Sequence, residues 1–129
     1  MLFGNRDKPI RFKGPEKNVI SDREHSDDFN AAEQFGRVRL GKLCLYYRDL
    51  GRKYYVPYDY IHRAFTRISQ CPEDEFSNNH EYYRLILVHN EKEFANLIFN
   101  EEKLIELIYE RLAEINPLIS IGFEKSIKK

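Results

Sequence analysis

Two hydrophobic periods run along this chain, and together they predict strands followed by one helix. From Gly36 onward, apolar residues alternate with polar ones, which is the period of a half-buried β-strand. Towards the C-terminus, apolar residues instead recur every three or four positions, which is the period of an amphipathic helix. The pattern therefore predicts a mainly β (α+β) domain with one C-terminal α-helix.

The alternating region predicts six strands. Asp49-Leu50-Gly51 is a turn signal with a glycine available for positive φ, so the second and third strands are expected to form a hairpin. Pro57 has no N–H for a sheet hydrogen bond and is expected to end the third strand. The fifth strand is apolar on both faces around Arg84, which predicts a central strand. The predicted strands are Gly36–Leu40, Leu43–Arg48, Lys53–Val56, Ile61–Ile68, Tyr82–Val88 and Phe94–Phe99.

The predicted helix spans Glu101–Ile115, with Asn100 as its N-cap and Asn116-Pro117 as its end. The short apolar segment Leu118–Phe123 then adds a strand or packs under the helix. The apolar stripe, which must cover something apolar, consists of Leu104, Ile105, Ile108, Leu112 and Ile115.

Residues 1–33 mix charges of both signs with Pro, Gly, Asn and Ser and show no sustained period. They are expected to form a disordered or extended N-terminal arm, which leaves residues 34–129 as the domain. Within the arm, Pro9–Lys13 alternates and can supply an edge strand, while Asp28–Phe35 can form one or two helical turns. Residues 71–80 are polar and predict a solvent loop.

Length and charge narrow the class of protein. The chain of 129 residues is long enough for one core, and its formal net charge of zero argues against a protein that coats nucleic acid. No apolar run is long enough to span a membrane, and the N-terminus lacks the apolar core of a signal peptide. Cys44 and Cys71 lie far apart in sequence, and Cys44 falls in an apolar strand. A reducing cytoplasm is the expected location.

Two runs carry a resemblance to a known fold family. Arg39-Leu-Gly-Lys-Leu-Cys-Leu-Tyr-Tyr-Arg48 is followed by Tyr54-Tyr-Val-Pro-Tyr-Asp-Tyr-Ile61, which contains a V-P-Y-x-x-I step after a strand. This region resembles uncharacterised bacterial members of the pleckstrin-homology-like (PH-like) superfold over residues 36–115. The resemblance implies a seven-stranded, strongly bent antiparallel sheet or partly open β-barrel capped by the C-terminal helix. The N-terminal arm or the loop at 71–80 would supply the seventh strand.

Positive charge gathers in the first half of the predicted sheet. Residues 36–70 hold eight basic against two acidic residues, whereas residues 71–100 hold two basic against six acidic ones. Lys42, Arg48, Arg52 and Lys53 are therefore candidates for an anion site around the first hairpin, because Arg and Lys form charge-assisted hydrogen bonds to phosphate or carboxylate. Lys42 and Arg48 resemble the first two basic positions of lipid-binding PH domains, but Leu50 stands at the third. The alternative is a solvated strand face.

Two other functional classes have weaker support. Tyrosines interleaved with arginines can stack single-stranded nucleic acid, although tyrosine also packs well in strands. For catalysis, the four histidines form no metal-binding motif, and the pair of Cys71 and His80 forms no nucleophile motif. The histidines are His25, His62, His80 and His89. The tyrosines are Tyr46, Tyr47, Tyr54, Tyr55, Tyr58, Tyr60, Tyr82 and Tyr83.

The sequence therefore predicts a non-catalytic PH-like interaction module that binds a protein segment or acts as a small scaffold, with no metal or cofactor. The alternative is binding of an anionic ligand, such as a lipid headgroup, phosphate or nucleic acid, on the basic hairpin face. A hydrolytic enzyme with an unrecognised site is the third hypothesis. The partner and the oligomeric state stay open.

Overall fold

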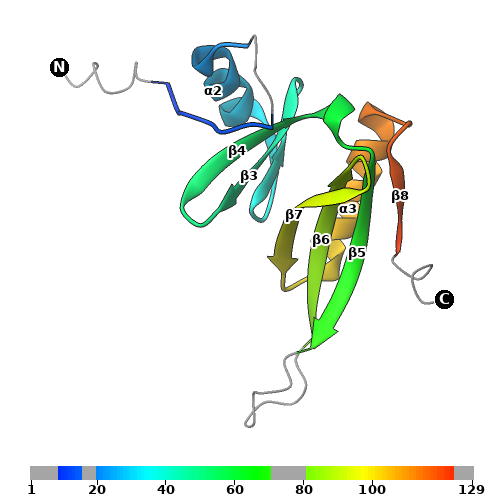
Figure 1. Cartoon of the computed structure of the whole chain (residues 1–129). Coiled ribbons are helices and arrows are strands. Elements are labelled where there is room, and N and C mark those ends of the chain that lie inside the picture. Colours follow the sequence, from blue (N-terminus) through cyan, green and yellow to red (C-terminus); the bar gives the residue numbers. More distant parts are fainter. Residues whose placement is uncertain (1–8, 16–19, 71–80, 124–129) are drawn as a thin grey trace. The chain divides into compact units, whose positions relative to one another are not determined.

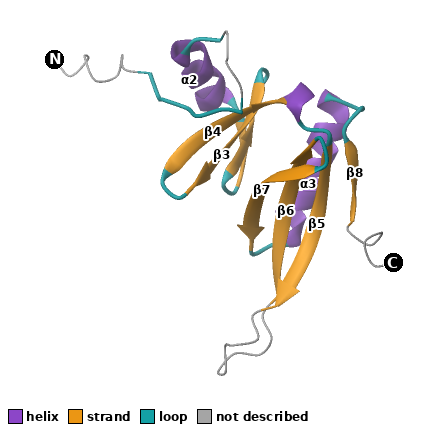
Figure 2. Ribbon diagram, in the orientation of Figure 1, coloured by secondary structure: helices purple, strands orange, loops and turns teal. Residues whose placement is uncertain are grey.

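The computed structural model describes residues 9–15, 20–70 and 81–123, and its fold is mainly β (Figure 1). In these ranges, eight strands form two four-stranded sheets, accompanied by two α-helices (Figure 2). The chain divides into two compact units, Met1–Tyr58 and Asp59–Lys129. Neither sheet of the described residues closes into a barrel, so the mainly β class is confirmed without a closed barrel.

The first unit is an antiparallel sheet with one helix. Its strands follow one another in the order β1-β2-β3-β4. β3 and β4 form the predicted hairpin, and its two-residue turn places Leu50 at φ 52° and Gly51 at φ 78°. β4 ends at Pro57, as predicted. The elements are α2 (Asp22–Ala31), β1 (Glu33–Phe35), β2 (Val38–Leu40), β3 (Cys44–Asp49) and β4 (Arg52–Pro57).

β3 is buried on both faces, which differs from the half-buried strand that alternation predicted. Cys44, Leu45, Tyr46 and Tyr47 are all at most 8% exposed. At the supposedly polar positions, Tyr46 buries its ring and has only a hydroxyl to satisfy, and Cys44 behaves as a small apolar side chain, so the alternating pattern did not produce a solvent-exposed face. Only Arg48, at the end of the strand, is exposed.

Helix α2 occupies part of the segment that was expected to be irregular, so that prediction was wrong for residues 22–31. Ser21 accepts a hydrogen bond from the Glu24 N–H at 3.1 Å, and the Glu24 carboxylate accepts one from the Ser21 N–H at 3.2 Å. This capping box is a sequence signal for a helix start that the weak apolar period concealed. The helical turns expected over Asp28–Phe35 are also wrong beyond Ala31, because β1 starts at Glu33.

The arm and α2 build one face of the first unit. The core cluster on this face contains Phe29, Cys44, Tyr46 and Tyr55, and Ile10 and Phe12 pack against it. Lys13 forms a parallel bridge with Tyr54 at the edge of β4, so the predicted edge strand is present as one bridge. The Lys13 N–H donates to the Lys53 carbonyl at 3.0 Å, and the Tyr55 N–H donates to the Lys13 carbonyl at 2.9 Å.

The second unit is a sheet in the order β7-β6-β5-β8, with β6 in the central position that was predicted for Tyr82–Val88. β8 pairs in parallel with β5, which confirms the strand alternative for the C-terminal apolar segment. The predicted loop at 71–80 lies outside the described residues. The elements are η1 (Tyr58–Tyr60), which begins in the first unit, β5 (Arg63–Gln70), β6 (Glu81–His89), β7 (Lys92–Phe99), α3 (Glu102–Ile115) and β8 (Ser120–Phe123).

Of the predicted stripe on helix α3, Ile105, Ile108 and Leu112 are fully buried, whereas Leu104 is half-buried and Ile115 is exposed. The Tyr109 hydroxyl lies 2.6 Å from the Thr66 hydroxyl of β5, which ties the helix to the sheet. The prediction of Asn100 as N-cap was wrong, because the N-cap is Glu101 and no side chain caps the helix.

Replacing Ile108 by Ala is expected to lower the free energy of unfolding by about 2–5 kcal/mol, because a buried large side chain is lost and a cavity remains. Urea denaturation measures the change. Ile115→Ala removes the same side chain from the same helix at a position 41% exposed, so it is expected to cost less than about 1 kcal/mol. Equal effects of the two substitutions would show that α3 is not fixed by its stripe.

Deleting residues 1–33 is expected to abolish the cooperative unfolding of the first unit. The deletion removes α2 and the arm, and with them Phe29, Ile10 and Phe12 from the core cluster. Near-ultraviolet circular dichroism during heating follows the buried tyrosines. An unchanged transition in the truncated protein would contradict this expectation and show that residues 34–129 fold alone.

Candidate anion-binding site

The β3–β4 hairpin brings together three of the four predicted anion-site residues. Arg48 lies directly opposite Lys53, so both side chains share a face, and Arg52 lies opposite Asp49 on the other face. Lys42 lies in the turn before β3, six residues from Arg48, which is roughly 20 Å along an extended strand. The structure therefore places Arg48, Arg52 and Lys53 at the hairpin tip and Lys42 away from it.

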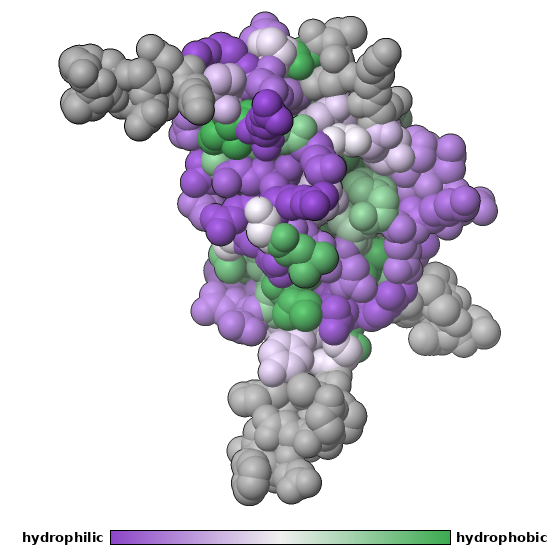
Figure 3. Space-filling view, turned by 60° about the vertical axis from the view of Figure 1, so that its left-hand side comes forward, coloured by the Kyte–Doolittle hydropathy of each residue, from purple (hydrophilic) through white to green (hydrophobic). Residues whose placement is uncertain are grey.

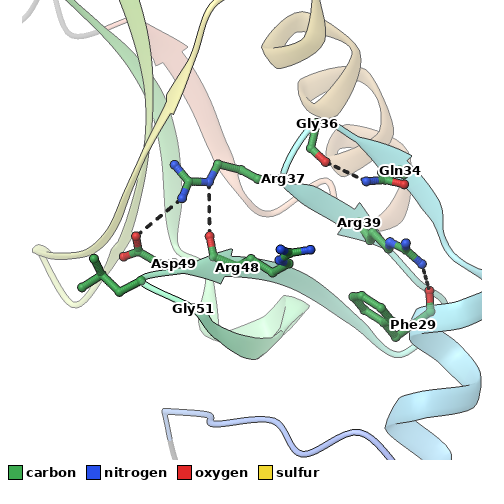
Figure 4. A pocket seen from close by; sticks show the side chains of 9 residues that line it. Phe29, Gln34, Gly36, Arg37, Arg39, Arg48, Asp49 and Gly51 are labelled. Atoms are coloured by element: carbon green, nitrogen blue, oxygen red, sulfur yellow. Dashed lines mark hydrogen bonds and ion pairs between the residues drawn. The ribbon is translucent and has the colours of Figure 1, made fainter.

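A hollow of about 340 Å³ lies beside this hairpin in the first unit, and we call it the arginine pocket (Figure 4). Arg37 and Arg39 join Arg48 around it, so three guanidinium groups meet one carboxylate, that of Asp49. The residues that line it are Phe29, Gln34, Gly36, Arg37, Arg39, Arg48, Asp49, Leu50 and Gly51.

Two of the three guanidinium groups are held in place. Arg39 lies 4.1 Å from the centre of the Phe29 ring and donates to the Phe29 carbonyl at 3.0 Å. Arg37 donates from Nε to the Arg48 carbonyl at 3.2 Å, and its terminal nitrogen lies 3.6 Å from the Asp49 carboxylate. Among the described residues, the Arg48 guanidinium has no hydrogen-bond or ion-pair partner. The pocket therefore presents donors already positioned for an anion.

A second hollow, of about 520 Å³, lies where the N-terminal arm passes the hairpin, and we call it the arm hollow. Its lining contains four basic residues and no acidic one. On the face drawn in Figure 3, the described residues are mostly hydrophilic, with separate hydrophobic patches. The lining residues are Ile10, Arg11, Phe12, Lys13, Gly51, Arg52 and Lys53.

Sequence reasoning missed four of these cations, namely Arg11, Lys13, Arg37 and Arg39. Arg39 lies on β2, the strand paired with β3, and Arg37 directly precedes that strand; their alternation with Val38 was a usable signal for a shared face. Arg11 and Lys13 lie about 40 residues from the hairpin in sequence. Only the bridge between Lys13 and Tyr54 places the arm beside β4.

A hydrogen-bond network centred on the half-buried Asp28 carboxylate holds α2, which supplies Phe29, against this sheet. Asp28 accepts hydrogen bonds from the backbone N–H groups of Lys42 at 2.8 Å and Leu43 at 3.0 Å. It also accepts one from the Tyr46 hydroxyl at 2.8 Å. His25 Nδ1 lies 3.1 Å from that hydroxyl oxygen, and since Tyr46 already donates to Asp28, the His25 N–H is the donor.

The acid–base groups around this network are held neutral. Burial lowers the pKa of His25, an effect that Asp22, Asp28 and Glu24 partly oppose. Burial also raises the pKa of the Cys44 thiol to about 12 and, with the hydrogen bond to Asp28, raises that of Tyr46. A neutral imidazole and a protonated thiol suit a structural network better than a nucleophile, because the thiolate is the reactive form.

The tyrosine, histidine and cysteine candidates from the sequence do not form a second site within the described residues. Tyr46, Tyr47, Tyr55 and Tyr58 are buried, so half of the proposed stacking tyrosines belong to the core. In the second unit, His62 Nδ1 accepts from the Asn90 N–H at 3.1 Å, and His89 stacks on Tyr60 at 3.6 Å. Cys71 and His80 lie outside the described residues. Within the described ranges, no group of three His, Cys, Asp or Glu residues is placed to hold a metal.

Comparison of the chain with protein-family models, curated proteins and solved structures found no match. Among the described residues, no helix has both the length and the apolar character to cross a membrane. Interpretation of the site therefore depends on its own geometry.

Acidification below pH 6.5 is expected to destabilise the protein through His25. A lowered folded-state pKa means that the unfolded state binds the proton first, so this contribution is complete above pH 6.5 and falls as the pH drops towards the folded-state pKa. Urea denaturation at several pH values measures it. The variant His25→Gln keeps an N–H donor but cannot titrate, so the difference in unfolding free energy between the two proteins should shrink as the pH falls. A constant difference would contradict the burial of a neutral His25.

Proposed function

We propose that this chain is a non-catalytic, PH-like interaction module that binds a protein segment through acidic side chains of that segment. The observation that carries the proposal is the arginine pocket, where the Arg48 guanidinium, which has no partner among the described residues, lies beside the two fixed groups of Arg37 and Arg39. A carboxylate entering this pocket replaces water on donors that are already oriented, so little side-chain entropy is lost on binding.

The element order supports the PH-like part of the proposal. Seven strands, β1 to β7, precede helix α3, which is the strand number that the resemblance implies. β1 supplies the seventh strand at the junction with the arm. In the V-P-Y-x-x-I step, Pro57 ends β4 and Tyr58 starts η1, where its hydroxyl donates to the Gly41 carbonyl at 2.6 Å. The additional elements α2 and β8 depart from that plan.

The chemistry of the described groups supports binding rather than catalysis. The Cys44 thiol is buried with a pKa of about 12, and the His25 imidazole is inside the same core face. Neither is exposed to a substrate, and the two basic hollows contain donors without a general base beyond Asp49. A reduced Cys44 fits the proposed cytoplasmic location.

A second candidate is docking to an anionic membrane surface, which Leu50 favours. This apolar side chain is 91% exposed at the hairpin tip and sits in the left-handed backbone region, where Asn or Gly costs less. The exposed apolar side chain is unfavourable in water, and both hollows around the tip are basic. An apolar side chain surrounded by basic residues suits an anionic lipid interface.

The test is binding of a labelled peptide of alternating Glu and Ala, measured by fluorescence anisotropy at two salt concentrations. Binding is expected at low salt and should weaken at high salt. Arg48→Gln is expected to weaken it by about tenfold or more, since a hydrogen bond to a charged group contributes roughly 1.5–3 kcal/mol. Lys42→Gln removes the same charge from the other end of β3 and should change the affinity by less than about twofold.

Equal effects of the two substitutions, or no peptide binding at low salt, would rule out the arginine pocket. Phosphatidylcholine vesicles with and without phosphatidylserine test the second candidate in the same buffers. Leu50→Asn should stabilise the turn yet reduce vesicle binding if the tip inserts into lipid. Vesicle binding without peptide binding would favour the membrane candidate over the protein segment.

A further inference from the structure

The two units carry opposite charge. Residues 1–58 hold 12 basic and eight acidic side chains, a net charge of +4, and residues 59–129 hold nine basic and 13 acidic ones, a net charge of −4. The zero net charge of the chain is therefore the sum of a basic first unit and an acidic second unit. Opposite potentials on one molecule make copies of it complementary to one another.

The acidic charge of the second unit includes a row along helix α3. Glu102, Glu106, Glu110 and Glu114 follow one another at four-residue spacing, so neighbouring carboxylates repel along the helix. Glu106 and Glu110 are exposed, and among the described residues neither has an ion-pair partner. The last turn contains Glu114 and no basic residue, which also opposes the helix dipole. Within helix α3, Arg111 forms an ion pair with Glu114 at 3.7 Å.

The basic hairpin also lacks partners of opposite charge. Among the described residues, no acidic side chain pairs with Arg48, Arg52 or Lys53. The facing pair of Arg48 and Lys53 has Cβ atoms about 5 Å apart, and glutamates four residues apart on a helix have Cβ atoms about 6 Å apart. Two successive glutamates of the row can therefore meet two cations of the hairpin at once.

From this complementarity we infer that the protein segment bound at the basic hairpin is helix α3 of a second copy of this chain. The inference rests on the proposed function and names its partner. The contact lets Arg48 and Lys53 of one copy, which share a face of the hairpin, neutralise Glu106 and Glu110 of the other, and it removes the like-charge repulsion along the row. The association is electrostatic and weakens with salt.

Sedimentation velocity over a range of protein concentrations, at low and high salt, tests the inference. Concentration-dependent self-association is expected at low salt and should be lost at high salt. Arg48→Glu should raise the dissociation constant by at least about tenfold, because like charges then face each other. Lys42→Glu makes the same charge change away from the hairpin and should leave association within about twofold.

A charge swap identifies the two surfaces. The double variant Arg48→Glu, Lys53→Glu and the double variant Glu106→Lys, Glu110→Lys should each be monomeric when alone. Mixed together, they should associate with each other, since each reversed surface now meets its complement. Circular dichroism checks that both variants remain folded; Arg48, Glu106 and Glu110 are solvent-exposed, and Lys53 is half-buried.

The outcomes separate this inference from the proposed function. A chain that stays monomeric at low salt but binds the Glu and Ala peptide overturns the second-copy partner and leaves the arginine pocket standing. Self-association that persists in the hairpin variant, or no association in the mixture, also overturns the inference. An unmodified chain that neither binds the peptide nor self-associates at low salt overturns both proposals.

Discussion

The Asp28 carboxylate is the interaction on which the first unit depends. One side chain from α2 accepts two short backbone hydrogen bonds from the turn between β2 and β3, and a third from the buried Tyr46 hydroxyl. Tyr46 is fully buried, so its hydroxyl would otherwise lose water without a partner, at a cost of roughly 1–3 kcal/mol. Gly41 belongs to the same arrangement, because a Cβ at this position would collide with the Asp28 carboxylate.

The proposed binding surface follows from that anchor. With α2 fixed on the sheet, the Phe29 ring and carbonyl hold the Arg39 guanidinium, and β2 positions Arg37 against the end of β3. Positive charge is thus concentrated by backbone pairing and not by attraction among the cations, which repel one another. Such a concentration persists in a folded protein because the core cluster and the Asp28 network stabilise the sheet independently of it.

Hydrophobic period alone predicted most of the sheet and the C-terminal helix. The β3–β4 hairpin, the central β6 and the stripe of α3 are local patterns in which neighbours in sequence are neighbours in space. The period failed where burial comes from distant residues. α2 has a weak stripe of its own and is held by a capping box and by Asp28, and β3 is buried on both faces although its pattern alternates.

For the candidate site, the sequence by itself determined the hairpin tip with Arg48, Arg52 and Lys53, because a two-residue turn fixes which residues face each other. Only the tertiary structure decided that Arg37 and Arg39 complete the arginine pocket, that Arg11 and Lys13 reach the arm hollow, and that Lys42 stays apart. The physical reason is that these cations are brought near by sheet pairing and by one bridge to the arm, and long-range pairings of this kind leave no period in the sequence.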